Sequence, residues 1–170
     1  CAARARSGDS VLFDTVRQSP AARSFPPKGP TLFSRTTDGG RTWSKPRVLY
    51  DPGLLAQTIG NVVVVLPDGT YVDFFNQIDY TTAEERIGLV RSHDKGRTWE
   101  RRPTVADVEA TFFSVTPDEQ EPIRDAANLF DVAVDPASGN LYAVLQEYRY
   151  HGVEEVSFLM STDGGDSWTT

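Results

Sequence analysis

Residues 36–43 read Thr-Thr-Asp-Gly-Gly-Arg-Thr-Trp, and the chain repeats this pattern twice more. Residues 92–99 read Ser-His-Asp-Lys-Gly-Arg-Thr-Trp, and residues 161–168 read Ser-Thr-Asp-Gly-Gly-Asp-Ser-Trp. The copies share the pattern hydroxyl-x-Asp-x-Gly-x-hydroxyl-Trp, and each follows an apolar run that is typical of a strand. Three copies in 170 residues indicate a repeat architecture.

The repeated stretch has the chemistry of a tight turn. An Asp carboxylate accepts hydrogen bonds from backbone N–H groups two or three residues on, and glycine adopts positive φ without a steric penalty. The closing Trp offers a large apolar surface to a core, so we expect all three Trp side chains to be largely buried, each starting the outgoing strand of a hairpin. We therefore assign a structural role, without substrate contact, to Asp38, Gly40, Trp43, Asp94, Gly96, Trp99, Asp163, Gly165 and Trp168.

The pattern resembles the Asp-box, which is also called the bacterial neuraminidase repeat. The resemblance implies a β-propeller of the sialidase-like kind, with each Asp-box between the third and fourth strands of a blade. Asp-boxes also occur in non-catalytic propellers, in other glycosidases and in sorting receptors. The motif therefore indicates a fold more strongly than a function.

Length and spacing limit how much of a propeller the chain can form. A four-stranded blade takes about 40–50 residues, and a propeller has about 4–8 blades. The Trp residues of successive boxes are 56 and 69 positions apart. We predict an all-β chain, one partial β-propeller domain over residues 1–170, with about three four-stranded antiparallel blades of a six-bladed sialidase-like propeller.

Turn signals divide the chain into three blade units. They cover residues 8–50, 60–105 and 126–170, with a loop insertion at 106–125. Pro67-Asp68-Gly69 is a hairpin turn, because Pro presets φ and Gly accepts positive φ. We expect the first unit to lack its innermost strand and the third to lack its outermost strand.

Composition argues against several classes of partner. A net charge of −7 and a pI of 4.8 disfavour nucleic acid, which binds basic surfaces. No apolar run reaches the roughly 18–20 residues of a membrane span. Two His and one Cys make a zinc site of the usual ligands a poor prediction, so we predict no metal and no cofactor.

The longer loops point to one functional face. Strand direction alternates in an antiparallel blade, so the boxes and short turns share one face and the longer loops share the opposite one. Binding and catalysis favour loops carried by a rigid scaffold, so we expect the functional face to lie away from the boxes. The loops predicted on that face cover residues 17–30, 50–60, 76–85, 106–127 and 147–154.

Titratable side chains are dense in two of these loops. Glycoside hydrolysis usually takes two carboxylates, one as acid and one as base or nucleophile, and Arg binds acidic sugars through paired hydrogen bonds. The same residues also suit a solvated strand end or a loop ion pair. The catalytic candidates are Glu147, Asp125 and Glu121, and the substrate-binding candidates are Arg124, Arg149, Tyr148 and Arg17.

Three functions remain open. The resemblance implies a secreted bacterial sialidase-like glycoside hydrolase, an exo-glycosidase that is extracellular or at the cell surface, with a glycan ligand and further blades as partners. The alternatives are a non-catalytic propeller that binds carbohydrate or protein on the loop face, and a scaffold without a ligand. Known sialidases carry Arg-Ile-Pro before the first box, whereas this chain has Arg23-Ser24-Phe25-Pro26, and it shows no complete catalytic set.

Overall fold

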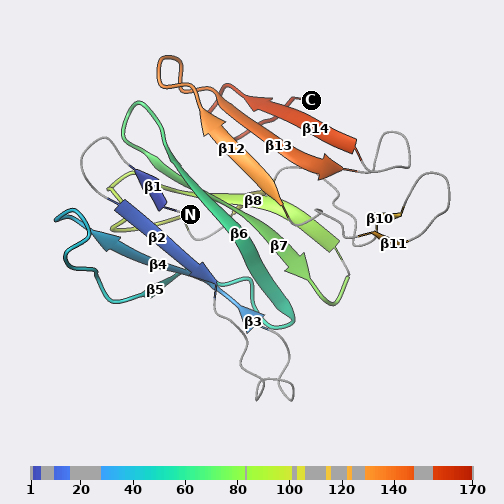
Figure 1. The fold of residues 1–170 in the computed structure, drawn as a ribbon, viewed down its shortest axis with the longest axis horizontal. Coiled ribbons are helices and arrows are strands. Elements are labelled where there is room, and N and C mark those ends of the chain that lie inside the picture. Colours follow the sequence, from blue (N-terminus) through green and yellow to red (C-terminus); the bar gives the residue numbers. More distant parts are fainter. Residues whose placement is uncertain are drawn as a thin grey trace.

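The structure is a computed structural model of the 170-residue chain. It describes residues 2–4, 10–15, 28–82, 84–100, 103–105, 114–115, 122–123, 129–147 and 155–169. Every secondary-structure element in these ranges is a β-strand, which confirms the all-β class (Figure 1). The described residues include no helix long and apolar enough to cross a membrane.

The first sheet contains four antiparallel strands in the order β1-β2-β4-β5. Their bounds are β1 (Ala2–Arg4), β2 (Ser10–Thr15), β4 (Thr31–Thr36) and β5 (Arg47–Tyr50). The prediction that the first unit lacks its innermost strand is wrong, because β1 pairs with β2. A three-residue strand rich in Ala and Arg carries little β signal, which is why the sequence did not reveal it.

The second sheet has five strands in the order β3-β6-β7-β8-β9. They are β3 (Lys28–Gly29), β6 (Ala56–Val65), β7 (Tyr71–Asp79), β8 (Glu84–Ser92) and β9 (Thr104–Val105). Only β3 pairs in parallel among them, with β6. The predicted Pro-Asp-Gly turn joins β6 to β7, with Gly69 at φ 88°.

The third sheet contains β12 (Phe130–Val134), β13 (Leu141–Glu147) and β14 (Glu155–Ser161). Its outer edge carries an isolated bridge in which Met160 and Thr169 exchange both backbone hydrogen bonds, at 2.8 and 2.9 Å. A separate two-stranded pair, β10 (Ser114–Val115) with β11 (Pro122–Ile123), interrupts the stretch that was predicted as a loop insertion.

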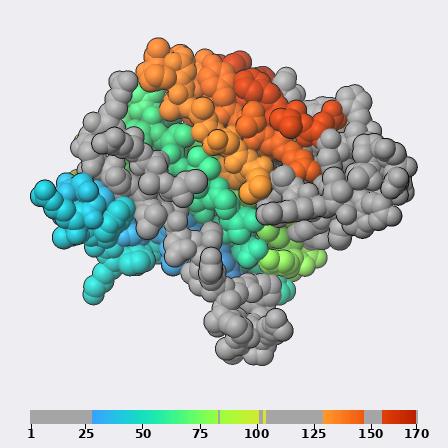
Figure 2. All heavy atoms as spheres, viewed as in Figure 1, coloured from blue at the N-terminus to red at the C-terminus, as the bar shows by residue number. Residues whose placement is uncertain are grey.

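The second sheet is buried on both faces because its strands alternate between two cores. One core contains Phe74 and Leu89 of the second sheet with Leu141 of the third. The other contains Tyr71 packed with Phe33 of the first sheet. Figure 2 shows the atoms of the third sheet, in orange and red, lying directly against the green atoms of β6. The three sheets therefore pack in chain order, face against face.

Each box forms the predicted turn, and the second box shows its bonds. The carboxylate of Asp94 accepts hydrogen bonds from the backbone N–H groups of Arg97 and Thr98, both at 2.8 Å, and from the Thr98 hydroxyl at 2.6 Å. The Ser92 hydroxyl donates to Asp94 and accepts from the N–H of Gly96. The first and third boxes repeat this arrangement, so the predicted hydrogen bonds of each Asp side chain to its own turn are confirmed.

A glycine in each of the last two boxes packs against the preceding sheet. A Cβ atom built on Gly96 would lie 2.6 Å from Cζ of Phe33, and one built on Gly165 would lie 2.7 Å from Cδ2 of Leu89. Phe33 and Leu89 occupy the same place in the repeat, three residues before their own box. The contact between sheets therefore repeats along the chain with the period of the boxes.

Two of the three box Trp side chains also pack against the preceding sheet, and Trp43 is the exception. Trp99 lies edge-on to Phe33 of the first sheet at 5.3 Å, and Trp168 lies edge-on to Phe74 of the second sheet at 5.9 Å. These two rings are partly buried, whereas Trp43 is 43% exposed, so its predicted burial is wrong. A box Trp is covered by the sheet before it, and the residues that the structure describes include no sheet before the first one.

Candidate functional site

The boxes lie at the strand ends opposite the turn at residues 80–82, as predicted, but the loop predicted over 76–85 is shorter, because β7 extends to Asp79 and β8 begins at Glu84. In the second sheet, Tyr71 pairs with Ser92 beside the box, whereas Asp79 pairs with Glu84 at the other end. The third sheet has the same arrangement, because Leu141 pairs with Ser161, the first residue of the box, and Glu147 pairs with Glu155 at the other end. We call these the box end and the loop end.

The carboxylates of Asp38, Asp94 and Asp163 at the box end are engaged within their own turns. The Thr42 hydroxyl, followed by the Thr42 backbone N–H, donates to Asp38 and lowers the pKa of Asp38 to about 2. Hydroxyl donors at the corresponding position likewise hold the pKa values of Asp94 and Asp163 below the ordinary range. An ionised carboxylate that is committed to hydrogen bonds of its own turn is a poor acid or nucleophile, so these three Asp residues are poor catalytic candidates.

We predict that the boxes make the fold sensitive to acid. Because the folded-state pKa of Asp38 lies below its unfolded value of about 3.9, its contribution is complete above about pH 4 and is lost as the pH falls toward 2. The urea concentration at the unfolding midpoint should therefore decrease less between pH 4 and pH 2 in Asp38→Asn than in the wild type. Glu84→Gln, outside the boxes, serves as the control. Equal acid sensitivity in all three proteins would contradict the prediction.

Most of the predicted catalytic and substrate-binding residues lie outside the described part of the chain. Glu147 is placed by its backbone alone, as the last residue of β13, where it pairs with Glu155 of β14 at the loop end. Its convergence with the other candidates stays a prediction. The residues outside the described ranges are Glu121, Arg124, Asp125, Tyr148, Arg149 and Arg17.

The structure adds one buried carboxyl group at the loop end. Glu85 is 2% exposed at the start of β8, and Asn76 of β7 donates a hydrogen bond to it at 3.0 Å. Glu85 shares its strand face with Ile87 and Leu89, which belong to the core against the third sheet. This alternation was the sequence signal that could have singled Glu85 out. A carboxyl group buried at a strand end is a candidate acid.

Other carboxylates described at the loop end stabilise their own surroundings. Asp51 pairs with Lys28 at 2.8 Å, and Glu84 pairs with Arg86 at 2.9 Å, with all four side chains substantially exposed. Exposed pairs of this kind contribute about 0–1 kcal/mol. Within the ranges that the structure describes, no group of three His, Cys, Asp or Glu side chains could hold a metal ion.

A buried polar cluster joins the first and second sheets. Asp73 of β7 is fully buried and accepts from the amide of Asn61 at 3.0 and 3.2 Å. The same amide donates to Thr31, whose hydroxyl lies 2.7 Å from that of Thr58, and Thr58 donates to the carbonyl of Gly29. Burial raises the pKa of Asp73 well above its ordinary value, so its environment favours the neutral acid.

No known family profile matches the chain. A curated Paenibacillus xyloglucanase is 31% identical over 139 residues, which span 79% of this chain and 13% of that enzyme. A Dyadobacter fermentans protein of unknown function has a similar structure, with a TM-score of 0.61 and 18% identity over 99% of this chain. So does the Trypanosoma rangeli sialidase, with a TM-score of 0.52 and 15% identity over 95% of this chain.

The NanB sialidase of Streptococcus pneumoniae also matches, with a TM-score of 0.51 and 10% identity over 99% of this chain. The chain has the fold of the sialidase-like Asp-box β-propellers. It spans about half the length of the NanB and Dyadobacter structures, and 26% of the T. rangeli sialidase.

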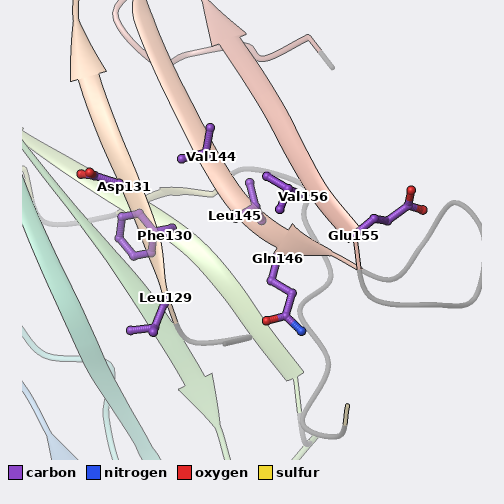
Figure 3. A pocket seen from close by; sticks show the side chains of 8 residues that line it. All are labelled: Leu129, Phe130, Asp131, Val144, Leu145, Gln146, Glu155 and Val156. Carbon is purple, nitrogen blue, oxygen red and sulfur yellow. The ribbon is translucent and has the colours of Figure 1, made fainter. Parts of the chain in front are cut away.

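The outward face of the propeller's third sheet is apolar and uncovered by any described residue. Phe158, three residues before its box like Phe33 and Leu89, is 55% exposed. Beside it, Val144 and Val156 are exposed, and an open hollow of about 480 Å³ lies along the sheet. Figure 3 shows its lining side chains, which are Leu129, Phe130, Asp131, Val144, Leu145, Gln146, Glu155 and Val156. Its lining is largely hydrocarbon, which suits packing against another sheet better than catalysis.

We predict that Asp73→Asn changes the pH dependence of propeller stability. Because burial raises the folded-state pKa of Asp73, its ionisation opposes folding, and this cost is absent below about pH 3.9 and grows as the pH rises. Asn cannot ionise. The free energy of unfolding of the variant, minus that of the wild type, should therefore increase from pH 3 to pH 7. A urea titration at both values measures this difference. A difference independent of pH would refute the assignment of Asp73 as a costly buried acid.

Proposed function

We propose that the three sheets are blades of a six-bladed propeller in a secreted glycoside hydrolase that acts on glycans. The observation that carries the blade assignment is the repeated contact of each box glycine with the preceding sheet, at Phe33 and again at Leu89. The exposed Phe158 stands at the next place in this series. A following blade with its own box glycine would cover Phe158 in the same way.

The names of the relatives support a glycan as the substrate class. One is a xyloglucanase, and two similar structures with different sequences are sialidases. The net charge of −7 suits a neutral glycan and does not by itself favour an acidic one. We therefore place a neutral polysaccharide of the xyloglucan kind ahead of a sialylated glycan.

The proposed chemistry lies at the loop end. Glu147 and either Asp125 or Glu121 would supply the acid and the base or nucleophile, at about 5 Å for a retaining and about 6.5–9.5 Å for an inverting reaction. Glu85, buried at the same end of the neighbouring sheet, is a further candidate for the acid.

Sugar contacts in this proposal come from the remaining loop residues. Arg124 and Arg149 would donate to sugar oxygens, and Arg17 would do so from the first unit. Tyr148 would offer an aromatic face or pack between blades. In this proposal the Arg and Tyr side chains position the glycan, and the carboxyl groups transfer the protons.

The experiment is an assay of the full-length protein on xyloglucan and on a sialylated oligosaccharide. We expect release of reducing ends from xyloglucan, and the product size separates exo-action, which gives single sugars, from internal cleavage. Calorimetric binding of the same glycans is measured in parallel. Binding without hydrolysis would replace the hydrolase by a non-catalytic propeller, and neither binding nor hydrolysis would refute a glycan-directed function.

A further inference from the structure

The gap between the first and second sheets at the box end contains a cationic hollow. Arg35, Lys45, Arg47 and Arg97 line this space of about 210 Å³, together with Ser44. Two cations come from the strand before the first box and the strand after it, and Arg97 comes from the second box. In a chain with a net charge of −7, four clustered cations are unexpected.

No described carboxylate neutralises this cationic hollow. Among the residues that the structure describes, none of its four cations makes an ion pair. Arg35 donates to the carbonyl of Lys95 at 2.5 Å, and Arg47 donates to the carbonyls of Gly96 and Arg97. Carbonyl oxygens orient the two guanidinium groups without cancelling their charge, and each guanidinium has five N–H donors.

The next gap along the chain has the same backbone contact but the opposite charge. Arg91, directly before the second box as Arg35 is before the first, donates to the carbonyl of Gly164 at 2.9 Å. It also pairs with Asp166 at 2.7 Å and Glu100 at 3.4 Å. Two carboxylates thus neutralise this arginine.

The difference between the gaps lies at two positions of the repeat. Asp166 holds the place in the third box that Arg97 holds in the second. Glu100 follows its box Trp, as Ser44 follows the first box Trp. Packing of the sheets therefore does not require Arg97, because the second gap forms the same arginine-to-carbonyl contact with Asp166 at that position.

We propose that the cationic hollow binds an oxyanion group, a sulfate, phosphate or carboxylate. Its fork-shaped Arg donors match a planar or tetrahedral oxyanion, and the exposed Ser44 and Lys45 add a hydroxyl and an ammonium donor. The site lies at the box end, away from the loop end that the proposed hydrolysis uses. It is an additional site, independent of the glycan reaction.

The test is a titration of the protein with inorganic sulfate, inorganic phosphate and glucuronate, followed by calorimetry and by backbone NMR shifts. The key variant is Ser44→Glu with Arg97→Asp, which copies the charges of the second gap. We expect it to weaken binding of the preferred oxyanion at least about tenfold. Lys45→Glu should also weaken binding. The side chain of Lys45 is exposed and has no described hydrogen bond or ion pair, so this variant provides a second test if the double variant folds poorly.

The matched control is Arg41→Asp, which makes the charge change of Arg97→Asp at the same box position outside the hollow. We expect less than about a twofold effect on binding, because a screened, exposed charge acts weakly at a distance. Equal weakening by Arg41→Asp and the double variant would overturn the site in favour of general charge attraction. Failure of all three oxyanions to bind the wild-type protein would also overturn it.

Discussion

Gly96→Ala is expected to lower the free energy of unfolding by about 2–5 kcal/mol. Gly96 has φ +77°, where an L-residue costs about 1–2 kcal/mol. The added methyl group would also lie 2.6 Å from Cζ of Phe33, which is 1% exposed and has little room to move. Overpacking of this kind costs about 1–3 kcal/mol more.

Gly40→Ala separates these two causes. Gly40 stands at the same box position with φ +92°, but nothing lies within 4 Å of the place that its added methyl group would take. We expect a loss of about 1–2 kcal/mol, from the backbone alone. Gly165→Ala, which would meet Leu89 at 2.7 Å, should behave like Gly96→Ala. Urea denaturation of the three variants measures the series, and equal losses would contradict the repeated contact between sheets.

Glu147→Gln is expected to lower kcat for glycan hydrolysis by about 10²–10⁴-fold, the usual contribution of a positioned acid or base. Gln keeps the size of the side chain and removes the ability to exchange a proton. The melting temperature should change little, because Glu147 ends its strand. The effect should appear in kcat more than in KM, since proton transfer stabilises the transition state.

Glu84→Gln is the control for this prediction. Glu84 is an exposed carboxylate at the loop end, paired with Arg86 at 2.9 Å, and its loss should leave kcat within about twofold. Unchanged kcat in Glu147→Gln would remove Glu147 from the chemistry. Asp125→Asn, Glu121→Gln and Glu85→Gln then decide which carboxyl groups remain.

The turns could be predicted from the sequence because their interactions are local. Asp94 binds groups three and four residues away, so eight residues contain the whole motif and its hydrogen bonds. The end of each sheet that carries the boxes followed from strand alternation alone. Both predictions needed no knowledge of how one sheet meets the next.

The features that escaped prediction depend on contacts between sheets. The exposure of Trp43 is decided by what precedes its sheet, and the Asp73 cluster joins strands more than ten residues apart. The sequence shows that Arg97 and Asp166 differ in charge at the same box position. Only the structure shows that Asp166 pairs with Arg91, whereas Arg35 bonds a carbonyl group. The carboxylates predicted at 121 and 125 lie outside the described residues, so their placement stays a prediction.

The central claim is that the boxes build the propeller and the loop end acts on the glycan. It is tested most directly by measuring kcat for glycan hydrolysis and the melting temperature on the same samples of Asp94→Ala. The account predicts a lower melting temperature, because Asp94 holds its turn through the Thr98 hydroxyl and two backbone N–H groups, with kcat of the folded protein unchanged. A fall in kcat at an unchanged melting temperature would contradict it.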